Sequence, residues 1–205
     1  MKNIKISTRI LGTISILVLL LVIVVSIALM QLRSMRGNAE AITGNALPSV
    51  EVINTMSTEL VRARLLELRH VNNTEPAYLD QVEKQFAELQ GRLAQDKKLY
   101  EPLIISKEER DLYDQFIKER ERYVELNAQL FKLSHDGEKD KAKEFMAGES
   151  LKLYNQSSAT LDKLIKYNSD MARSETKASG EVYDGAIMML VLATVVALVL
   201  AVIAG

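Results

Sequence analysis

The chain has 205 residues, a size that fits one domain or at most two, and its net charge is −1. With 48% hydrophobic and 26% charged residues it has the average composition of a soluble protein, but the two kinds of residue are segregated. Residues 10–30 and 185–205 carry no charge, and every acidic residue lies between these two runs. The segregation argues against a simple soluble enzyme, and the absence of a basic surplus argues against a nucleic-acid-binding protein.

The first uncharged run, residues 10–30, is long enough to cross a bilayer as a helix. A cleaved signal peptide is the alternative, but its apolar core is usually about 7–15 residues long and ends at small residues. Here the sequence QLR (31–33) follows instead. We therefore expect a retained transmembrane helix at 10–30 and a second one at 185–205. Because no charged anchor follows the second run, we expect the sequence to be a longer protein cut where it leaves the membrane.

Charge near the first run predicts the topology. Lys2, Lys5 and Arg9 precede it without any acidic residue, which places residues 1–9 in the cytoplasm, although Arg33 and Arg36 just beyond the run reduce the asymmetry. Two spans then place residues 31–184 outside and return the end of the chain to the cytoplasm. We expect a two-pass protein of the inner (plasma) membrane.

The segment between the runs shows helical spacing of its apolar residues and no sustained strand-like alternation. The first outer helix should continue from the first span, with a kink or short break near residues 45–47 caused by Pro48. Asn73 or Thr74 should cap the second helix, with Pro76 in its first turn.

The second and third helices have the clearest repeats. In the second, steps of three and four join Leu79, Val82, Phe86, Leu89, Leu93 and Tyr100, with Asp96 as the polar exception. The third should begin at a capping box formed by Ser106 and Glu109 and end at Gly137. Its predicted core positions are Leu112, Phe116, Tyr123, Leu126, Leu130 and Leu133, with Glu119 as the polar exception.

A short helix over 138–147 should stop at Gly148, and the fourth long helix should start near Glu149 or Ser150. No proline interrupts it, so it can run on into the second span. The predicted fold is therefore all-α, an antiparallel up-down-up-down four-helix bundle whose helices 1 and 4 are continuous with the two membrane helices.

These features together resemble the periplasmic four-helix-bundle sensor domain of bacterial methyl-accepting chemotaxis receptors. The similarity includes the short basic N-terminus, the segments ALPSV (46–50) and RARLLELRH (62–70), the DGE turn (136–138) and the second span. The resemblance implies a homodimer that binds its ligand at the membrane-distal end, close to the interface between the first helices. It also implies a shift of the last helix that controls a cytoplasmic kinase and adaptor through a region beyond residue 205.

Arginines on the first outer helix are the main candidate ligand contacts. Arg62 and Arg69 are seven residues apart and share a face, whereas Arg64 lies on a different one. A dimer could combine Arg64 of one chain with Arg69 of the other to hold a carboxylate. Aspartate-sensing members of the family use an R-x4-R-x3-R pattern. Asn73 replaces its third arginine here, which argues against recognition of an amino acid or a C4-dicarboxylate in that manner but leaves anion binding open. We expect a small carboxylate-bearing metabolite, with organic acids ahead of amino acids.

The start of the fourth long helix is the second half of the candidate site. Ser150 and Arg64 are each about 35 residues from a span, so they should lie at similar height. Free backbone N–H groups at 148–150 would suit a carboxylate, and Tyr154 could pack against it. The plainer alternative is that Arg64 simply pairs with Glu67 on its own helix.

No pattern predicts catalysis. The chain has no Cys, so thiol chemistry and thiolate metal sites are excluded, and its two histidines fit no metal or hydrolase motif. We expect no enzyme activity, no cofactor, no metal and no nucleic-acid partner. Two alternatives stay open. The same input domain could serve a sensor histidine kinase or a diguanylate cyclase, or the chain could be a two-span protein-interaction module without a metabolite ligand.

Overall fold

The computed structural model describes residues 6–204, and these form two compact units, Gly44–Met171 and the pair of segments 6–43 and 172–204. Lys2 and Lys5, on which the predicted cytoplasmic N-terminus depends, lie outside the described residues, as does the side chain of Arg9. The described elements are helical: α1 (Ile6–Ala41), π-helix η1 (Ile42–Ala46), α2 (Leu47–Val71), α3 (Pro76–Tyr100), 3-10 helix η2 (Glu101–Leu103), α4 (Lys107–His135), α5 (Lys139–Phe145), π-helix η3 (Met146–Ser150) and α6 (Leu151–Ala204).

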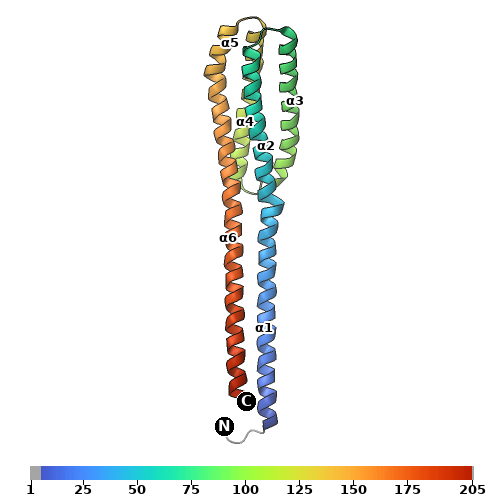
Figure 1. Cartoon of the computed structure of the whole chain (residues 1–205), viewed down its shortest axis with the longest axis vertical. Helices are drawn as coiled ribbons and strands as arrows, with labels where there is room; N and C mark the ends of the chain where they lie inside the picture. The colour runs from blue at the N-terminus through green and yellow to red at the C-terminus, as the bar shows by residue number, and fades with distance from the viewer. Residues whose placement is uncertain (1–5, 205) are drawn as a thin grey trace. The chain divides into compact units, whose positions relative to one another are not determined.

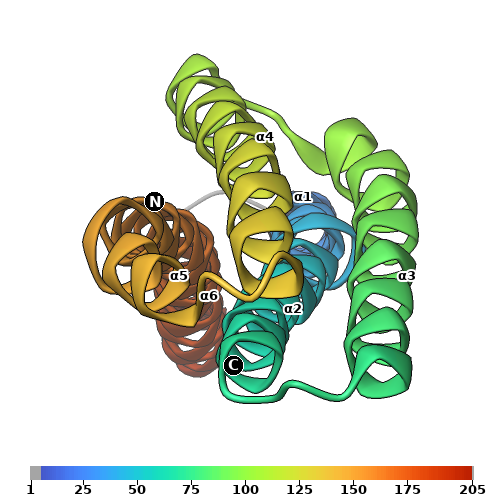
Figure 2. The ribbon, with the colours of Figure 1, turned by 90° about the horizontal axis from the view of Figure 1, so that it is seen from above.

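The unit Gly44–Met171 is the predicted antiparallel four-helix bundle. Its helices alternate in direction, with the α2–α3 and α4–α5 connections at one end and the α3–α4 connection at the other (Figure 1). Seen end-on, α2, α3, α4 and the α5–α6 segment surround a common core (Figure 2). The all-α, up-down-up-down fold class is therefore confirmed.

The bundle core follows heptad spacing on each helix, as knobs-into-holes packing requires. On α3 the buried residues are those of the predicted repeat, including Phe86, Leu89 and the polar Asp96. On α2, six core positions are spaced by steps of three and four, and two of them are polar: Ile53, Met56, Leu60, Ala63, Glu67 and His70. The core is thus apolar over most of its length, but it contains buried charged side chains at a few levels along the bundle axis.

The ends of α4 form as predicted. The Ser106 hydroxyl accepts a hydrogen bond from the Glu109 backbone N–H at 3.0 Å, which is the first half of a capping box. At the other end Gly137 adopts φ +81°, and the Glu138 N–H bonds the Leu133 carbonyl at 2.9 Å, which completes a Schellman-type stop.

The predicted polar exception on α4 was wrong. Arg120, not Glu119, occupies the core, because a strict three-four repeat through Tyr113, Phe116 and Tyr123 passes through position 120. The predicted repeat began at the half-buried Leu112 instead of the buried Tyr113, and a step of three from Phe116 then reached Glu119 instead of Arg120.

Two predicted helix boundaries were also displaced. The predicted break near 45–47 is realised as the π-helix Ile42–Ala46, one turn of wider winding just before Pro48. The N-cap of α3 is Glu75 rather than Asn73 or Thr74. Asn73 instead accepts a hydrogen bond from the Glu75 N–H at 2.9 Å, which closes the turn that precedes the helix.

The predicted helix start at residues 148–150 was wrong as well. The chain does not stop at Gly148: the π-helix Met146–Ser150 joins α5 to α6, and the Leu151 N–H bonds back into it. The backbone N–H groups at 148–150 therefore do not form a free helix N-terminus. Beyond them α6 runs unbroken from Leu151 to Ala204 and so includes the second uncharged run as far as it is described.

The second unit consists of helical segments, largely from α1 and α6, that contain the two uncharged runs as far as they are described. Two helical stretches, Ile10–Val71 and Lys139–Leu200, are long and apolar enough to cross a membrane, and their apolar windows are unburied. Large apolar side chains on both segments are half or more exposed, for example Leu19 at 61% and Leu198 at 62%. Such a surface suits a lipid environment, not water.

Candidate ligand-binding site

The structure separates the five candidate residues into two groups within the bundle. Arg64, Ser150 and Tyr154 come together around a buried carboxylate at the contact of α2, η3 and α6. Arg62 and Arg69 lie on a different, exposed face of α2. This arrangement agrees with the expected helical spacing of the three arginines.

The Arg64 guanidinium donates three hydrogen bonds, each to a different residue. Its Nη1 donates to Glu67 Oε2 at 2.5 Å and to the Ser150 hydroxyl at 3.2 Å, and its Nη2 donates to the Met146 carbonyl at 3.0 Å. This carbonyl belongs to the π-helix and also accepts a hydrogen bond from the Leu151 N–H. Glu67 is fully buried and Arg64 is 15% exposed, so this ion pair has one edge toward solvent.

Glu67 is the centre of the cluster, and the alternative that Arg64 pairs with it is confirmed. Its second oxygen, Oε1, accepts a hydrogen bond from the Ser150 hydroxyl at 2.8 Å. The Tyr123 hydroxyl lies close by without reaching hydrogen-bond geometry, and burial together with the Glu67 charge raises the pKa of Tyr123. A carboxylate that is buried in this way depends on its cation and its hydrogen bonds to offset the cost of removing its charge from water.

Tyr154 is a packing contact for the cluster. The Arg64 guanidinium carbon lies 5.9 Å from the centre of the Tyr154 ring, within the range of a cation–π interaction. The same ring lies 6.4 Å from that of Tyr123 on α4. The cluster therefore joins α2, α4 and α6 through both ionic and aromatic contacts.

Arg62 and Arg69 border a groove of about 470 Å³ between α2 and α3, which Arg92 and Glu88 also line. Among the described residues, neither Arg62 nor Arg69 forms an ion pair or hydrogen bond. Arg92, in contrast, donates from Nε to Glu59 at 2.9 Å. Two guanidinium groups are thus free for an anion on this face.

An exposed stripe runs along α2 between the two groups of arginines. Its members are spaced by steps of four and three and are all exposed: Leu47, Glu51, Asn54, Thr58, Val61, Leu65 and Leu68. Successive residues are about 100° apart around the helix axis. Viewed along that axis, Arg69 therefore lies about 40° to one side of Leu65, and Arg64 lies about 100° to the other side. The arginines therefore flank the apolar end of this α2 stripe on opposite sides.

Arg120 is a buried charged residue that the sequence reasoning missed. It is 2% exposed and is the largest fully buried side chain, yet both terminal nitrogens, Nη1 and Nη2, have no hydrogen-bond partner in the described part of the chain. Burial lowers the pKa of Arg120, whereas the negative charges of Glu59 and Glu67 act in the opposite direction. The strict heptad spacing of α4 was the sequence signal that could have found it.

A second polar cluster surrounds His70 in the bundle core. Its Nδ1 lies 2.8 Å from the Ser134 hydroxyl and its Nε2 lies 3.1 Å from Glu83 Oε1, while the ring stacks on Phe131. The Lys139 ammonium donates to Ser134 at 2.6 Å. Burial lowers the pKa of His70, an effect that Glu83 opposes. This cluster ties α2, α3, α4 and α5 together.

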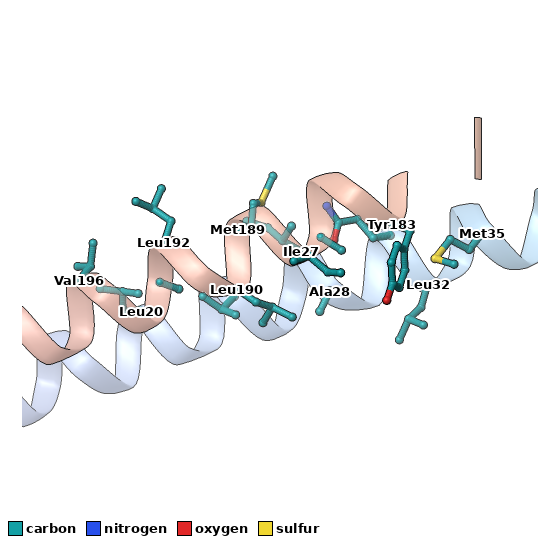
Figure 3. Close-up of a pocket in the computed structure, with 15 residues that line it drawn as sticks. Leu20, Ile27, Ala28, Leu32, Met35, Tyr183, Met189, Leu190, Leu192 and Val196 are labelled. Carbon is teal, nitrogen blue, oxygen red and sulfur yellow. The ribbon is translucent and has the colours of Figure 1, made fainter. Parts of the chain in front are cut away.

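The other unit contains an apolar groove of about 590 Å³ between its α1 and α6 segments (Figure 3). Leu20 and Ile27 line one side, and Leu190 and Val196 line the other. A carboxylate would find no cation there and would lose its hydration, so this groove does not fit an anionic ligand.

Comparison with known proteins agrees with the helical architecture. Residues 3–183 match the family described as the four-helix-bundle sensory module for signal transduction. Since the match covers most of the sequence, the chain belongs to this family, and the resemblance to chemoreceptor sensor domains is confirmed at that level. No curated protein matches the chain.

Proposed function

We propose that the chain is the sensory part of a transmembrane chemoreceptor that detects a small carboxylate-bearing metabolite, with organic acids preferred to amino acids. The family supports a sensory role, and the two apolar helical stretches support membrane insertion. In this proposal the bundle lies in the periplasm, both ends of the chain lie in the cytoplasm, and the chain is not an enzyme. The output is a cytoplasmic kinase with its adaptor, reached through a region beyond residue 205.

The receptor is proposed to be a homodimer that packs through the α2 stripe. Its heptad spacing is that of a two-helix coiled coil, and its distal end presents Val61, Leu65 and Leu68, which are 53%, 44% and 38% exposed. A two-fold axis along the stripe would bring the same surface of a second copy against it.

The dimer supplies the ligand site. Because Arg64 and Arg69 flank the stripe on opposite sides, parallel packing brings Arg64 of one copy toward Arg69 of the other. The observation that supports an anionic ligand most directly is that Arg62 and Arg69 lie beside this stripe without an ion pair among the described residues. Guanidinium groups bind carboxylate in a bidentate manner, which gives orientation as well as affinity.

Signalling in this proposal requires that the ligand binds more tightly when α6 is in one position than when it is in another. Ser150, the last residue of the π-helix that leads into α6, and Tyr154, in the first turn of α6, both contact Arg64. An anion that attracts Arg64 changes these contacts, so it favours one position of α6 over another. The displacement of α6 would then transmit the binding event along the helix, which is continuous from Leu151 to Ala204.

The test is thermal melting of the full chain in nanodiscs against a panel of organic and amino acids. A ligand present at about 100 times its dissociation constant adds about 2.7 kcal/mol, a shift of roughly 5–10 °C for a domain of this size. We expect Arg64→Ala and Arg69→Ala to abolish the shift. The matched control is Arg122→Ala on α4, an exposed arginine whose loss should leave the shift unchanged.

If no acid shifts the melting temperature of the wild-type chain, the metabolite-sensor proposal fails and the protein-interaction alternative replaces it. If Arg122→Ala abolishes the shift as completely as Arg69→Ala, the stabilisation is non-specific and the proposed site is wrong.

A further inference from the structure

The two histidines of the chain meet at the end of the bundle where α2 is joined to α3 and α4 to α5 (Figure 1). His70, in the last turn of α2, and His135, the last residue of α4, have ring centres 6.2 Å apart. Two carboxylates of α3, three residues apart and so on one face, lie against them. Glu83 Oε1 is 3.1 Å from His70 Nε2 and 3.9 Å from His135 Nε2, and Asp80 Oδ1 is 3.5 Å from His135 Nε2. Three helices thus bring two imidazoles and two carboxylates together.

The spacing of these donor atoms is close to that of a zinc site. Bonds from Zn²⁺ to nitrogen and oxygen are about 2.0–2.2 Å long, which sets the donors of a tetrahedral site about 3.3–3.6 Å apart. The His70–Glu83 and His135–Asp80 separations already lie near this range. The described residues hold no preformed metal site, so an ion must draw the ligands closer. Glu83 and His135 are each 42% exposed, so their side chains can rotate to shorten the contact between them.

His70 is the ligand that packing holds in place. It is fully buried, and its ring stacks on Phe131 with centres 4.4 Å apart. Its Nδ1 is 2.8 Å from the Ser134 hydroxyl, which donates to the His70 backbone carbonyl at 3.0 Å. With the single hydroxyl hydrogen of Ser134 directed to that carbonyl, Nδ1 donates to Ser134 and the Nε2 lone pair faces Glu83. Metal-bound histidines usually donate their second N–H to a supporting residue in this way.

The surroundings leave the Nε2 side accessible to a cation. The Lys139 ammonium donates to the Ser134 hydroxyl at 2.6 Å, so it lies on the Nδ1 side of the ring. A groove of about 540 Å³ between α3 and α4 is lined by Glu83 and His135. Lys132 also lines this groove, but its ammonium is paired with the C-cap aspartate of α4. An ion can therefore reach the two exposed ligands from solvent.

We propose that His70, His135, Glu83 and Asp80 form a binding site for a divalent transition-metal ion, with Zn²⁺ as the best match. Two imidazole nitrogens with carboxylate oxygens suit Zn²⁺, whereas Mg²⁺ and Ca²⁺ prefer oxygen ligands alone. The ion joins α2, α3 and α4 and gives the sensor module a second ligand, which needs neither the arginines nor an acid. The expectation of no metal rested on local motifs, and these ligands come from three separate helices.

The first test is calorimetric titration of the full chain with Zn²⁺, in nanodiscs and without a histidine tag, with empty nanodiscs as the blank. The chain has no Cys, and its two histidines are both in the proposed site, so other strong zinc ligands are absent from the sequence. We expect one Zn²⁺ per chain, unaffected by excess Mg²⁺, and a melting temperature that Zn²⁺ raises and a chelator restores.

Variants at the exposed ligands locate the ion without disturbing the core. We expect His135→Ala and Glu83→Gln each to weaken Zn²⁺ binding by more than about tenfold, since loss of a residue that only supports a ligand costs about 10–100-fold. The matched control is Glu125→Gln, which removes the same charge from an exposed position of α4 and should leave binding unchanged.

X-ray absorption of the zinc-loaded chain provides a measurement that needs no substitution. We expect nitrogen and oxygen ligands at about 2.0–2.2 Å and the scattering of two imidazole rings. Absence of stoichiometric Zn²⁺ binding to the wild-type chain, binding that His135→Ala retains, or a spectrum without imidazole would overturn the proposal. Each of these results is compatible with acid binding at the arginines, so failure here is distinguishable from failure of the proposed function.

Discussion

The replacement of Arg120 by methionine should stabilise the resting protein. The change removes two buried nitrogens without partners, each of which costs about 1–3 kcal/mol, and puts an apolar chain of similar length in their place. Against this gain, two cation–π contacts worth about 0.5–2 kcal/mol each are lost, together with attraction to Glu59 and Glu67. We expect a net gain of about 1–2 kcal/mol, within the range for replacement of buried ions by apolar side chains.

The assay is reversible thermal or chemical unfolding of the full chain, followed by far-ultraviolet circular dichroism. The gain corresponds to a melting temperature higher by roughly 2–8 °C. Arg122→Met, at an exposed position of α4, is the control and should change the free energy of unfolding by less than about 0.5 kcal/mol. A loss of stability in Arg120→Met would show that the buried guanidinium is satisfied in the resting state, and the reasoning about an unpaired cation would be refuted.

Three further predictions concern the helix ends and the His70 cluster. Because burial lowers the pKa of His70 below the ordinary 6.5, acidification through that value should destabilise the fold by up to about 1.4 kcal/mol per pH unit, and His70→Asn should flatten this part of the pH–stability profile. Gly137→Ala should cost about 1–2 kcal/mol in urea unfolding, since the residue adopts φ +81°; an unchanged midpoint would contradict the role given to this turn. Ser106→Ala should cost about 1 kcal/mol by losing the cap on the Glu109 N–H, whereas Ser106→Asp should retain most of the stability.

Much of the fold could be predicted because local signals and heptad spacing agree. The repeat from Leu79 to Tyr100, the capping serine Ser106 and the stop at Gly137 all appear where the sequence indicates them. Each depends on residues close together in the chain, so no tertiary information was needed.

The polar core was harder to predict: Asp96 was correctly assigned to it, but Arg120, Glu67 and His70 were not considered as core members. The same three-four spacing that identifies Phe116 and Tyr123 includes Arg120, and on α2 it includes Glu67 and His70. These residues are buried because their spacing forces them inward, whatever their chemistry. Heptad spacing was therefore a better predictor of buried positions than the hydrophobicity of single residues.

The candidate site was only partly accessible from sequence. The Arg64–Glu67 pair follows from helical spacing, but the contact of Arg64 with Ser150 joins residues far apart in the chain. Gly148 suggested a helix stop, whereas the chain continues through a π-helix there. A wider turn that replaces a break has no local sequence signature, so the free N–H groups were wrongly expected.

The most direct test of the central claim is binding by mixed dimers. Calorimetric titration with an acid from the melting panel should show no binding to Arg64→Ala or to Arg69→Ala alone. If each site combines Arg64 of one copy with Arg69 of the other, a dimer of one chain of each variant keeps one intact site. We therefore predict that mixing the two variants restores binding to one acid per mixed dimer. Binding that stays absent after mixing, with mixed dimers present, would contradict a ligand site shared between two copies.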